Sequence, residues 1–333
     1  MTKPLLSVTV LNYNYGHYLS GCLESILDQT FADFEVVLID DCSTDNSLEV
    51  IRPFLADPRV KLVAHKENQG FRKSLIEGTE VHSTGDFLTV ISADDLVMDR
   101  DAFRRQIEML TSDDEVVLCF SSVCDIYEEA VVRTHHSLPR DMRLSPQECL
   151  DHLLLDKHFW VLHSGAMFRK AAYVAAGGYR RDIEMIMDYA LWFPLCLEGD
   201  TGYIHEALYG YRMHSGQMSS KKMRLNAREE VLLINDACRA GEARGLRSLR
   251  HRRGAIRNRL SSGLVRDAFS GDRAKALSRL LAYVSVSPVE MLTSRETWLS
   301  LIRVALGEKG FDLMRRRLPL GSSRAVNSAG ARA

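Results

Sequence analysis

Two adjacent carboxylates, Asp94 and Asp95, follow closely on an apolar run, Phe87–Ile91. The run is typical of a buried strand, and burying two charges at its end is costly unless a cation or hydrogen bonds compensate them. Carboxylate oxygens are the ligands that hard divalent ions such as Mg2+ and Mn2+ prefer. In an open α/β sheet, ligands bind beyond the carboxyl ends of the strands. The pair therefore indicates a metal site at a sheet edge or, alternatively, two solvated acids at the start of a loop.

The segments before and after this pair alternate between strand and helix patterns. Apolar spacing and capping residues predict strands at 6–11, 34–39, 60–64, 87–91 and 115–121, and helices at 17–29, 43–55, 70–81 and 99–110. Repeated βα units of this length imply right-handed crossovers and a mostly parallel sheet. The predicted fold class is therefore α/β, with a doubly wound sheet.

The rest of the chain is mixed and then helical. Helices are predicted near 146–155, 169–176 and 187–198, and strands near 131–134, 164–168 and 207–213. We expect a first domain over 1–220, a helical region rich in Arg, Ala and Leu over 221–320, and a disordered tail over 321–333, which is small and polar.

The composition narrows the class of protein. The chain has 333 residues and a net charge of -1, which argues against nucleic acid as a partner. Its seven cysteines are scattered without a CxxC pair, which is typical of reduced thiols and predicts a cytoplasmic protein. We find neither a signal-peptide pattern at the start nor a run of about 18 apolar residues that would span a membrane.

Several short motifs occur in a fixed order along the first two-thirds of the chain. They are Val8-Thr9-Val10-Leu11-Asn12-Tyr13-Asn14, Ser25–Thr30, Asp33–Asp45, Asn68-Gln69-Gly70, Gly85-Asp86 leading to Ala93-Asp94-Asp95, Gly177-Gly178-Tyr179, Asp188–Trp192 and Tyr211-Arg212-Met213-His214. Each is weak by itself, but the ordered set over about 5–215 resembles the family 2 glycosyltransferases of the GT-A fold. These enzymes transfer a sugar from a nucleotide-diphospho-sugar with inversion.

The resemblance implies a nucleoside site after the first two strands. Asn12 and Tyr13 would hold the nucleobase, since stacking on an aromatic ring contributes roughly 1–3 kcal/mol. Asp41 would accept a hydrogen bond from the base, whereas Asp40 would satisfy turn amides. The alternative for Tyr13 is a packing role at the sheet edge.

The resemblance also implies a metal site and a general base. Asp94 and Asp95 match the last two positions of the family's DxD-type motif, with Asp95 on the metal and Asp94 on both ribose and metal. His214 would contact the metal or the diphosphate, or be a packing or surface residue. Asp188 would take the proton from the acceptor hydroxyl; the alternative is that it only caps the helix that follows.

Two positions depart from the family pattern. Ser92 stands where relatives often have Asp, which leaves one fewer carboxylate, and Leu75-Ile76 replaces a common Arg-Asn pair. Arg72 or Lys73 could supply the missing positive charge to the diphosphate, or simply be solvated. Trp192, one turn after Asp188, could stack on the acceptor sugar or belong to the core.

The predicted function is therefore that of a metal-dependent inverting glycosyltransferase using Mn2+ or Mg2+. The donor would be a nucleotide-diphospho-sugar, with UDP-sugars first, and the acceptor a hydroxyl of a glycan or lipid-linked molecule in cell-surface polysaccharide synthesis. Arginines crowd residues 239–259 and recur at 315–317, which suits peripheral contact with the inner face of the cell membrane, or a solvated or internally paired basic face. The alternative function is a non-catalytic nucleotide-binding scaffold. An NAD-dependent enzyme is disfavoured because no GxGxxG follows the first strand.

Overall fold

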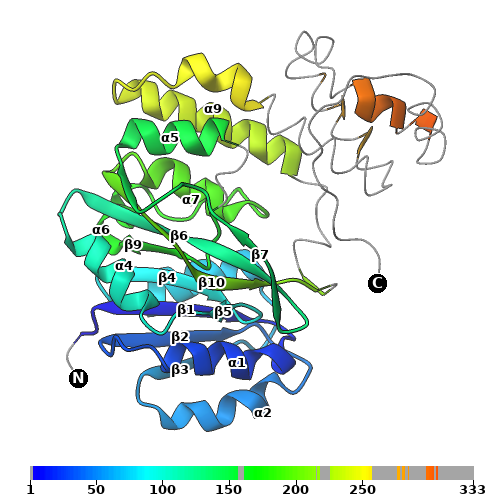
Figure 1. Cartoon of the computed structure of the whole chain (residues 1–333). Coiled ribbons are helices and arrows are strands. Elements are labelled where there is room, and N and C mark those ends of the chain that lie inside the picture. The colour runs from blue at the N-terminus through cyan, green and yellow to red at the C-terminus, as the bar shows by residue number, and fades with distance from the viewer. Residues whose placement is uncertain are drawn as a thin grey trace. The chain divides into compact units, whose positions relative to one another are not determined.

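A computed structural model describes residues 3–156, 161–214, 216–217 and 226–256, with short helical pieces between 276 and 306 (Figure 1). The chain divides into two compact units, Met1–Ala255 and Ile256–Ala333. The first unit thus includes residues 221–255, which the sequence analysis assigned to a separate helical region. The predicted tail over 321–333 and the arginines at 257, 259 and 315–317 lie outside the described residues.

The first unit is built on a single sheet with helices around it (Figure 1). The strands are β1 (Leu6–Asn12), β2 (Phe34–Asp40), β3 (Val60–Ala64), β4 (Phe87–Ser92), β5 (Leu96–Val97), β6 (Val116–Tyr127), β7 (Ala130–His135), β8 (Met142–Leu144), β9 (Ala166–Arg169) and β10 (Asp200–Arg212). The helices are α1 (Gly16–Leu27), α2 (Ser47–Ile51), η1 (Arg52–Ala56), α3 (Phe71–Glu77), η2 (Gly78–His82), α4 (Ala102–Thr111), α5 (Pro146–Leu155), α6 (Lys170–Ala175), α7 (Met187–Leu195), α9 (Asn226–Ala243) and η3 (Leu249–His251).

The strand order confirms the predicted α/β fold. The sheet runs β3-β2-β1-β4-β9-β6-β10-β5, with β7 paired to β6 and β8 to β10. The longest pairings, among β1 to β4 and between β6 and β10, are parallel, whereas β9 inserts antiparallel between β4 and β6. The sequence pattern missed β5 and β8, since strands of two or three residues are too short to show a period.

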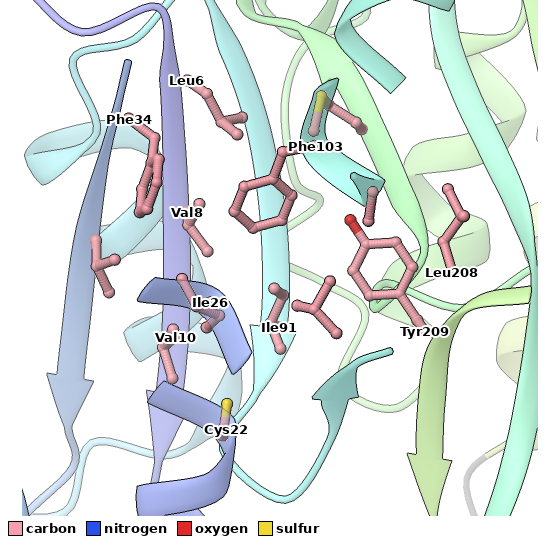
Figure 2. Packing of buried hydrophobic residues seen from close by; sticks show 14 of the residues in the cluster. Leu6, Val8, Val10, Cys22, Ile26, Phe34, Ile91, Phe103, Leu208 and Tyr209 are labelled. Carbon is pink, nitrogen blue, oxygen red and sulfur yellow. The ribbon is translucent and has the colours of Figure 1, made fainter. Parts of the chain in front are cut away.

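Alternation along β1 sends its side chains to two covered faces. Leu6, Val8 and Val10 join a core cluster with residues of α1 and α4 (Figure 2). The other face lies under η2, where a Cβ added at Gly78 would meet Thr9 Cγ2 at 2.6 Å. The glycine therefore permits a close approach of helix to sheet. Helices on both faces make the sheet doubly wound, as predicted.

A carboxylate is buried on this second face. The Oε1 atom of Glu35 accepts from Ser7 Oγ at 2.7 Å and from the amide and hydroxyl of Thr84, each at 2.7 Å. Its Oε2 atom accepts from Lys61 Nζ at 2.6 Å. Burial alone would raise the pKa of Glu35, but hydrogen bonds led by that from Lys61 outweigh it and lower the pKa to about 2.

Replacing Glu35 by Gln should destabilise the fold by about 2–3 kcal/mol, since a shift of one pKa unit corresponds to about 1.4 kcal/mol. The contribution of Glu35 is present in full above its unfolded pKa of 4.5 and is lost as the pH falls through about 2. Urea unfolding of both proteins from pH 7 down to pH 2 measures this. The two curves should converge at low pH, and the same substitution at exposed Glu67 should change little. A constant difference across this range would contradict the assignment.

Candidate active site at the carboxyl edge of the sheet

The carboxyl ends of the parallel strands meet at one edge of the sheet. The register pairs Asn12 with Asp40 and Leu11 with Ser92, so that β1, β2 and β4 end together. The polar residues that follow these strands are therefore neighbours in space, which is the usual location of a ligand site in such a sheet.

The acid pair lies in the turn after β4 and contacts the end of β10. Asp94 and Asp95 are 7% and 3% exposed. The Oδ2 atom of Asp94 lies 3.0 Å from His214 Nε2. The Oδ2 atom of Asp95 accepts from Ser164 Oγ at 2.6 Å, and its Oδ1 atom from the amide of Arg212 at 3.2 Å. The fold thus brings together all three residues predicted to hold a metal.

The raised pKa values of Asp94 and Asp95 indicate that this pair of acids favours binding of a cation. Burial raises the pKa of Asp95 well above its usual range, and the charge of Asp94 raises it further. Burial also raises the pKa of Asp94, although the hydrogen bond with His214 opposes it. An added cation stabilises the ionised form of two neighbouring buried acids whose pKa values are raised in this way.

Two tyrosines of the α1 region, Tyr15 and Tyr18, pack against His214. Tyr18 lies with its ring centroid 4.7 Å from that of His214, and Tyr15 packs edge-on to His214 at 5.5 Å. On the other side, the guanidinium of Arg212 lies 4.9 Å from the Tyr18 ring centroid, and its Nε donates to the Asp94 carbonyl at 3.0 Å. The imidazole is therefore held in orientation by packing as well as by Asp94.

The donor atoms fit a divalent ion only with ligands from a substrate. Within the described residues, no group of three or more His, Cys, Asp or Glu side chains is arranged to hold a metal. Asp94 and His214, whose Oδ2 and Nε2 atoms lie 3.0 Å apart, would hold such an ion together with Asp95, and the diphosphate of a bound donor would supply the remaining oxygen ligands.

Asp41, after β2, is held by three donors of the protein. Its Oδ1 atom accepts from the amide of Gln69 at 2.8 Å and faces His65 Nδ1 at 2.7 Å, and its Oδ2 atom accepts from the amide of Gly70 at 2.8 Å. Burial raises the pKa of Asp41, but these hydrogen bonds, with that of His65 the largest, lower it overall. Asp41 therefore anchors the loop before α3, and one acceptor position on Oδ2 remains for a ligand.

The neighbouring residues have two different environments: Asn12 and Asp40 belong to a hydrogen-bonded turn, whereas Tyr13 is exposed. Asn12 Nδ2 donates to Asp40 Oδ2 at 2.6 Å, and Asp40 accepts from the amide and hydroxyl of Ser43 at 2.9 and 2.7 Å. Asp40 thus has the structural role predicted for it. Tyr13, beside this turn, is 45% exposed and therefore accessible to a ligand.

Arg72 and Lys73, the two basic residues predicted to contact the diphosphate, differ in their surroundings at the start of α3. Arg72 Nη1 donates to the carbonyl of Arg181 at 2.6 Å and lies 3.8 Å from Glu184, which connects α3 to the segment before α7. Lys73 is exposed. Leu75 is fully buried in the core.

Asp188 lies in the first turn of α7, whose N-cap is Ile186 with no side-chain cap. It is therefore not the capping residue that the alternative required; its Oδ1 atom accepts from the Tyr189 amide at 2.9 Å. Asp188 as a whole is partly exposed. Of the two alternatives for Trp192, the structure supports the core and contradicts the acceptor contact, because the side chain is 0% exposed and packs edge-on to Phe120.

Comparison with known proteins decides the family. Residues 7–174, half of the chain, match the family described as Glycosyl transferase family 2. The chain belongs to glycosyltransferase family 2.

Among the relatives of this family 2 chain is the putative glycosyltransferase EpsE of Bacillus subtilis, 29% identical over 71% of the chain and 82% of EpsE. The hyaluronan synthase of Pasteurella multocida is 25% identical over 70% of the chain, which spans only 23% of that synthase. These relatives favour a transferase over the scaffolding alternative.

Solved structures agree on the GT-A fold. Staphylococcus aureus TarS, residues 1–349, has a TM-score of 0.58 and 14% identity, and covers 90% of this chain and 79% of its own. The mannosyltransferase PcManGT of Pyrobaculum calidifontis, in complex with GDP-Man and Mn2+, has a TM-score of 0.53 and 16% identity over 95% of this chain and 84% of its own. At such identities the likeness shows the fold alone.

The structure adds residues that the sequence analysis of this family 2 chain did not select. Ser164 and His65 lie in no motif that suggested a role. Arg212 stands two residues before His214, a spacing that places both side chains on the same side of an extended segment, and this signal could have found it.

Proposed function

We propose that this protein transfers a sugar from a nucleotide-diphospho-sugar to an acceptor hydroxyl with inversion and with the help of a divalent ion. The observation that supports this most is the meeting of Asp94, Asp95 and His214 at the carboxyl edge of the sheet. Family membership supports the transfer of a sugar. The ion, the stereochemistry and the substrates are proposals.

The donor's nucleoside would bind where β1 and β2 end. Tyr13 offers an exposed ring for the base. Asp41 has one acceptor position left after its three protein donors, which suits a base that presents a single N–H, such as uracil or thymine, better than guanine. We therefore propose a UDP-sugar as donor. TarS, of the same fold, has been crystallised with UDP and with UDP-GlcNAc, which is consistent with this choice.

Asp94, Asp95 and His214 would hold Mn2+ or Mg2+ together with the diphosphate. A divalent ion at this place would neutralise the charge that develops on the leaving diphosphate. Asp95, fixed by Ser164 and by the Arg212 amide, keeps its carboxylate oriented without the ligand. Arg72 is near enough to the segment before α7 to connect the diphosphate end of the donor with the acceptor side.

Asp188 would be the general base. A single in-line displacement requires a carboxylate that accepts the proton of the attacking hydroxyl, while the bond between the anomeric carbon and the diphosphate breaks on the opposite side. Asp188, a partly exposed residue in the first turn of α7, suits this role. Binding both substrates in line supplies a further part of the rate enhancement.

The acceptor would be a glycan or a lipid-linked molecule in polysaccharide synthesis, by analogy with the hyaluronan and chondroitin synthases. Contact with the membrane surface stays a prediction. Two of the clustered arginines have partners inside the protein, namely Arg244 with Glu198 and Arg252 with Asn235, which supports the alternative of an internally paired basic face for these two. Among the described residues, no helix is both long and apolar enough to cross a bilayer.

A thermal-shift panel tests the donor and the ion together. UDP with Mn2+ should raise the melting temperature by several degrees, because a ligand that binds only the folded state stabilises it in proportion to log affinity. UDP in EDTA should give a smaller shift, and GDP or TDP with Mn2+ a smaller one than UDP. If none of the three nucleotides raises the melting temperature with either Mn2+ or Mg2+, the proposed function is wrong.

A further inference from the structure

The turn between β6 and β7 has two consecutive left-handed residues that are not glycine. Tyr127 pairs with Ala130 across the hairpin, so Glu128 and Glu129 form a two-residue loop, with φ of 46° and 67°. Such loops favour Asn-Gly or Asp-Gly, because a Cβ raises the energy of the left-handed backbone. Strain that persists in a turn suggests that a side chain there has another role.

Glu129 reaches from this turn to a buried cation. Its carboxylate forms an ion pair with Nη1 of Arg212 on β10. The side chain of Glu129 is 74% exposed, whereas that of Arg212 is 7% exposed. The hairpin therefore supplies an exposed acid that balances a charge inside the site.

Arg212 contacts the proposed ligands of the metal with its other groups. Its Nε donates to the carbonyl of Asp94 at 3.0 Å, and its backbone amide donates to Asp95 Oδ1 at 3.2 Å. Its guanidinium lies 4.9 Å from the ring centroid of Tyr18, which in turn packs on His214. Arg212 thus links Glu129 to Asp94 through its side chain, to Asp95 through its backbone amide and to His214 through Tyr18.

We propose that Glu129 is a positioning residue for the metal and donor site, and that it acts by holding the guanidinium of Arg212 away from the carboxylates of Asp94 and Asp95. This inference rests on the proposed function. Arg212 already contacts both residues, since its Nε donates to the backbone carbonyl of Asp94 and its backbone amide donates to Asp95 Oδ1, so a guanidinium released by Glu129 lies close to the two carboxylates. It would bind them in place of the divalent ion, since Arg pairs readily with carboxylates. Loss of Glu129 therefore weakens binding of the ion and of the diphosphate.

Matched substitutions in the same turn test this proposal. Glu128→Gly and Glu129→Gly each relieve a left-handed residue, but only the second releases Arg212. Titration calorimetry with Mn2+ and UDP, and in parallel with Mn2+ and GDP, should show dissociation constants unchanged for Glu128→Gly and raised about tenfold for Glu129→Gly. In turnover, Glu129→Gly should raise KM for the donor more than it lowers kcat, and excess Mn2+ should restore part of the activity. The melting temperature of Glu128→Gly should rise by about 2–4 °C.

A double-substitution cycle shows whether Glu129 acts through Arg212. In an Arg212→Gln background, Glu129→Gly should weaken binding no further, since the two effects are one interaction. Three outcomes would each overturn the proposal. Glu129→Gly could bind as tightly as the wild type, both glycine variants could weaken binding equally, or the full effect of Glu129→Gly could persist in the Arg212→Gln background. If the wild-type protein binds neither nucleotide with Mn2+, the proposed function falls and this inference with it. If the wild-type protein binds a nucleotide with Mn2+ and Glu129→Gly binds it with the same affinity, only this inference is overturned.

Discussion

The variant Asp188→Asn is expected to lose sugar transfer by about 10²–10⁴-fold while it binds the donor as the wild type does, because an amide cannot accept the proton of the acceptor hydroxyl. Asp188 is partly exposed in the first turn of α7 and is not its N-cap, so the fold should tolerate the change. Initial rates of transfer and calorimetry with UDP and Mn2+ measure the two quantities separately.

A matched control is the same substitution at Asp182, whose ion pair with Arg180 leaves 59% of its side chain exposed. Asp182→Asn should transfer at nearly the wild-type rate. Normal turnover by Asp188→Asn would exclude it as the base. A parallel loss of UDP binding and melting temperature would instead assign Asp188 a structural role.

The variant Asp94→Asn is expected to lose both Mn2+-dependent UDP binding, by at least about thirtyfold, and transfer. It removes one of the two buried carboxylates and the partner of His214. Each pKa unit of favourable interaction with a cation corresponds to about 1.4 kcal/mol, so one lost ligand has a large effect on binding. Calorimetry with UDP, with and without Mn2+, measures this effect.

Asp94→Asn should lose ligand binding without losing thermal stability. Burial raises the pKa of both acids and the charge of Asp94 raises that of Asp95, so removing one charge relieves repulsion. The melting temperature without ligand should therefore stay the same or rise. The control is Asp86→Asn before β4, where the carboxylate pairs with exposed Lys3. Wild-type affinity for UDP with Mn2+ in Asp94→Asn would exclude Asp94 from the metal site.

The pH dependence of metal binding should follow the same acids. Because burial raises the pKa of Asp94 and Asp95, protons compete with the ion at a higher pH than they would at exposed carboxylates. Affinity for Mn2+ with UDP should therefore fall as the pH is lowered, and the fall should begin above the ordinary range of Asp.

The local patterns of this sequence determined much of the fold and the place of the site. Strands such as β1 and β2 have apolar residues throughout or in alternation, and α1 has them at helical spacing, so each element follows from its own residues. The carboxylates of Asp94 and Asp95 come at the end of such a strand, which placed them at the edge of the sheet. The order of the motifs indicated the family.

Only the tertiary structure decided which side chains are available to act. Trp192 has the sequence position of an acceptor contact, but its neighbours in space, Phe120 and Phe168, enclose it completely. His214 meets Asp94, and Glu129 meets Arg212, because the strand order places β10 beside β6 and β5. Periodicity along the chain reports the face of an element, since it arises from local backbone geometry. Burial and charge pairing depend on residues that are distant in the sequence, and these are brought together only when the sheet is assembled.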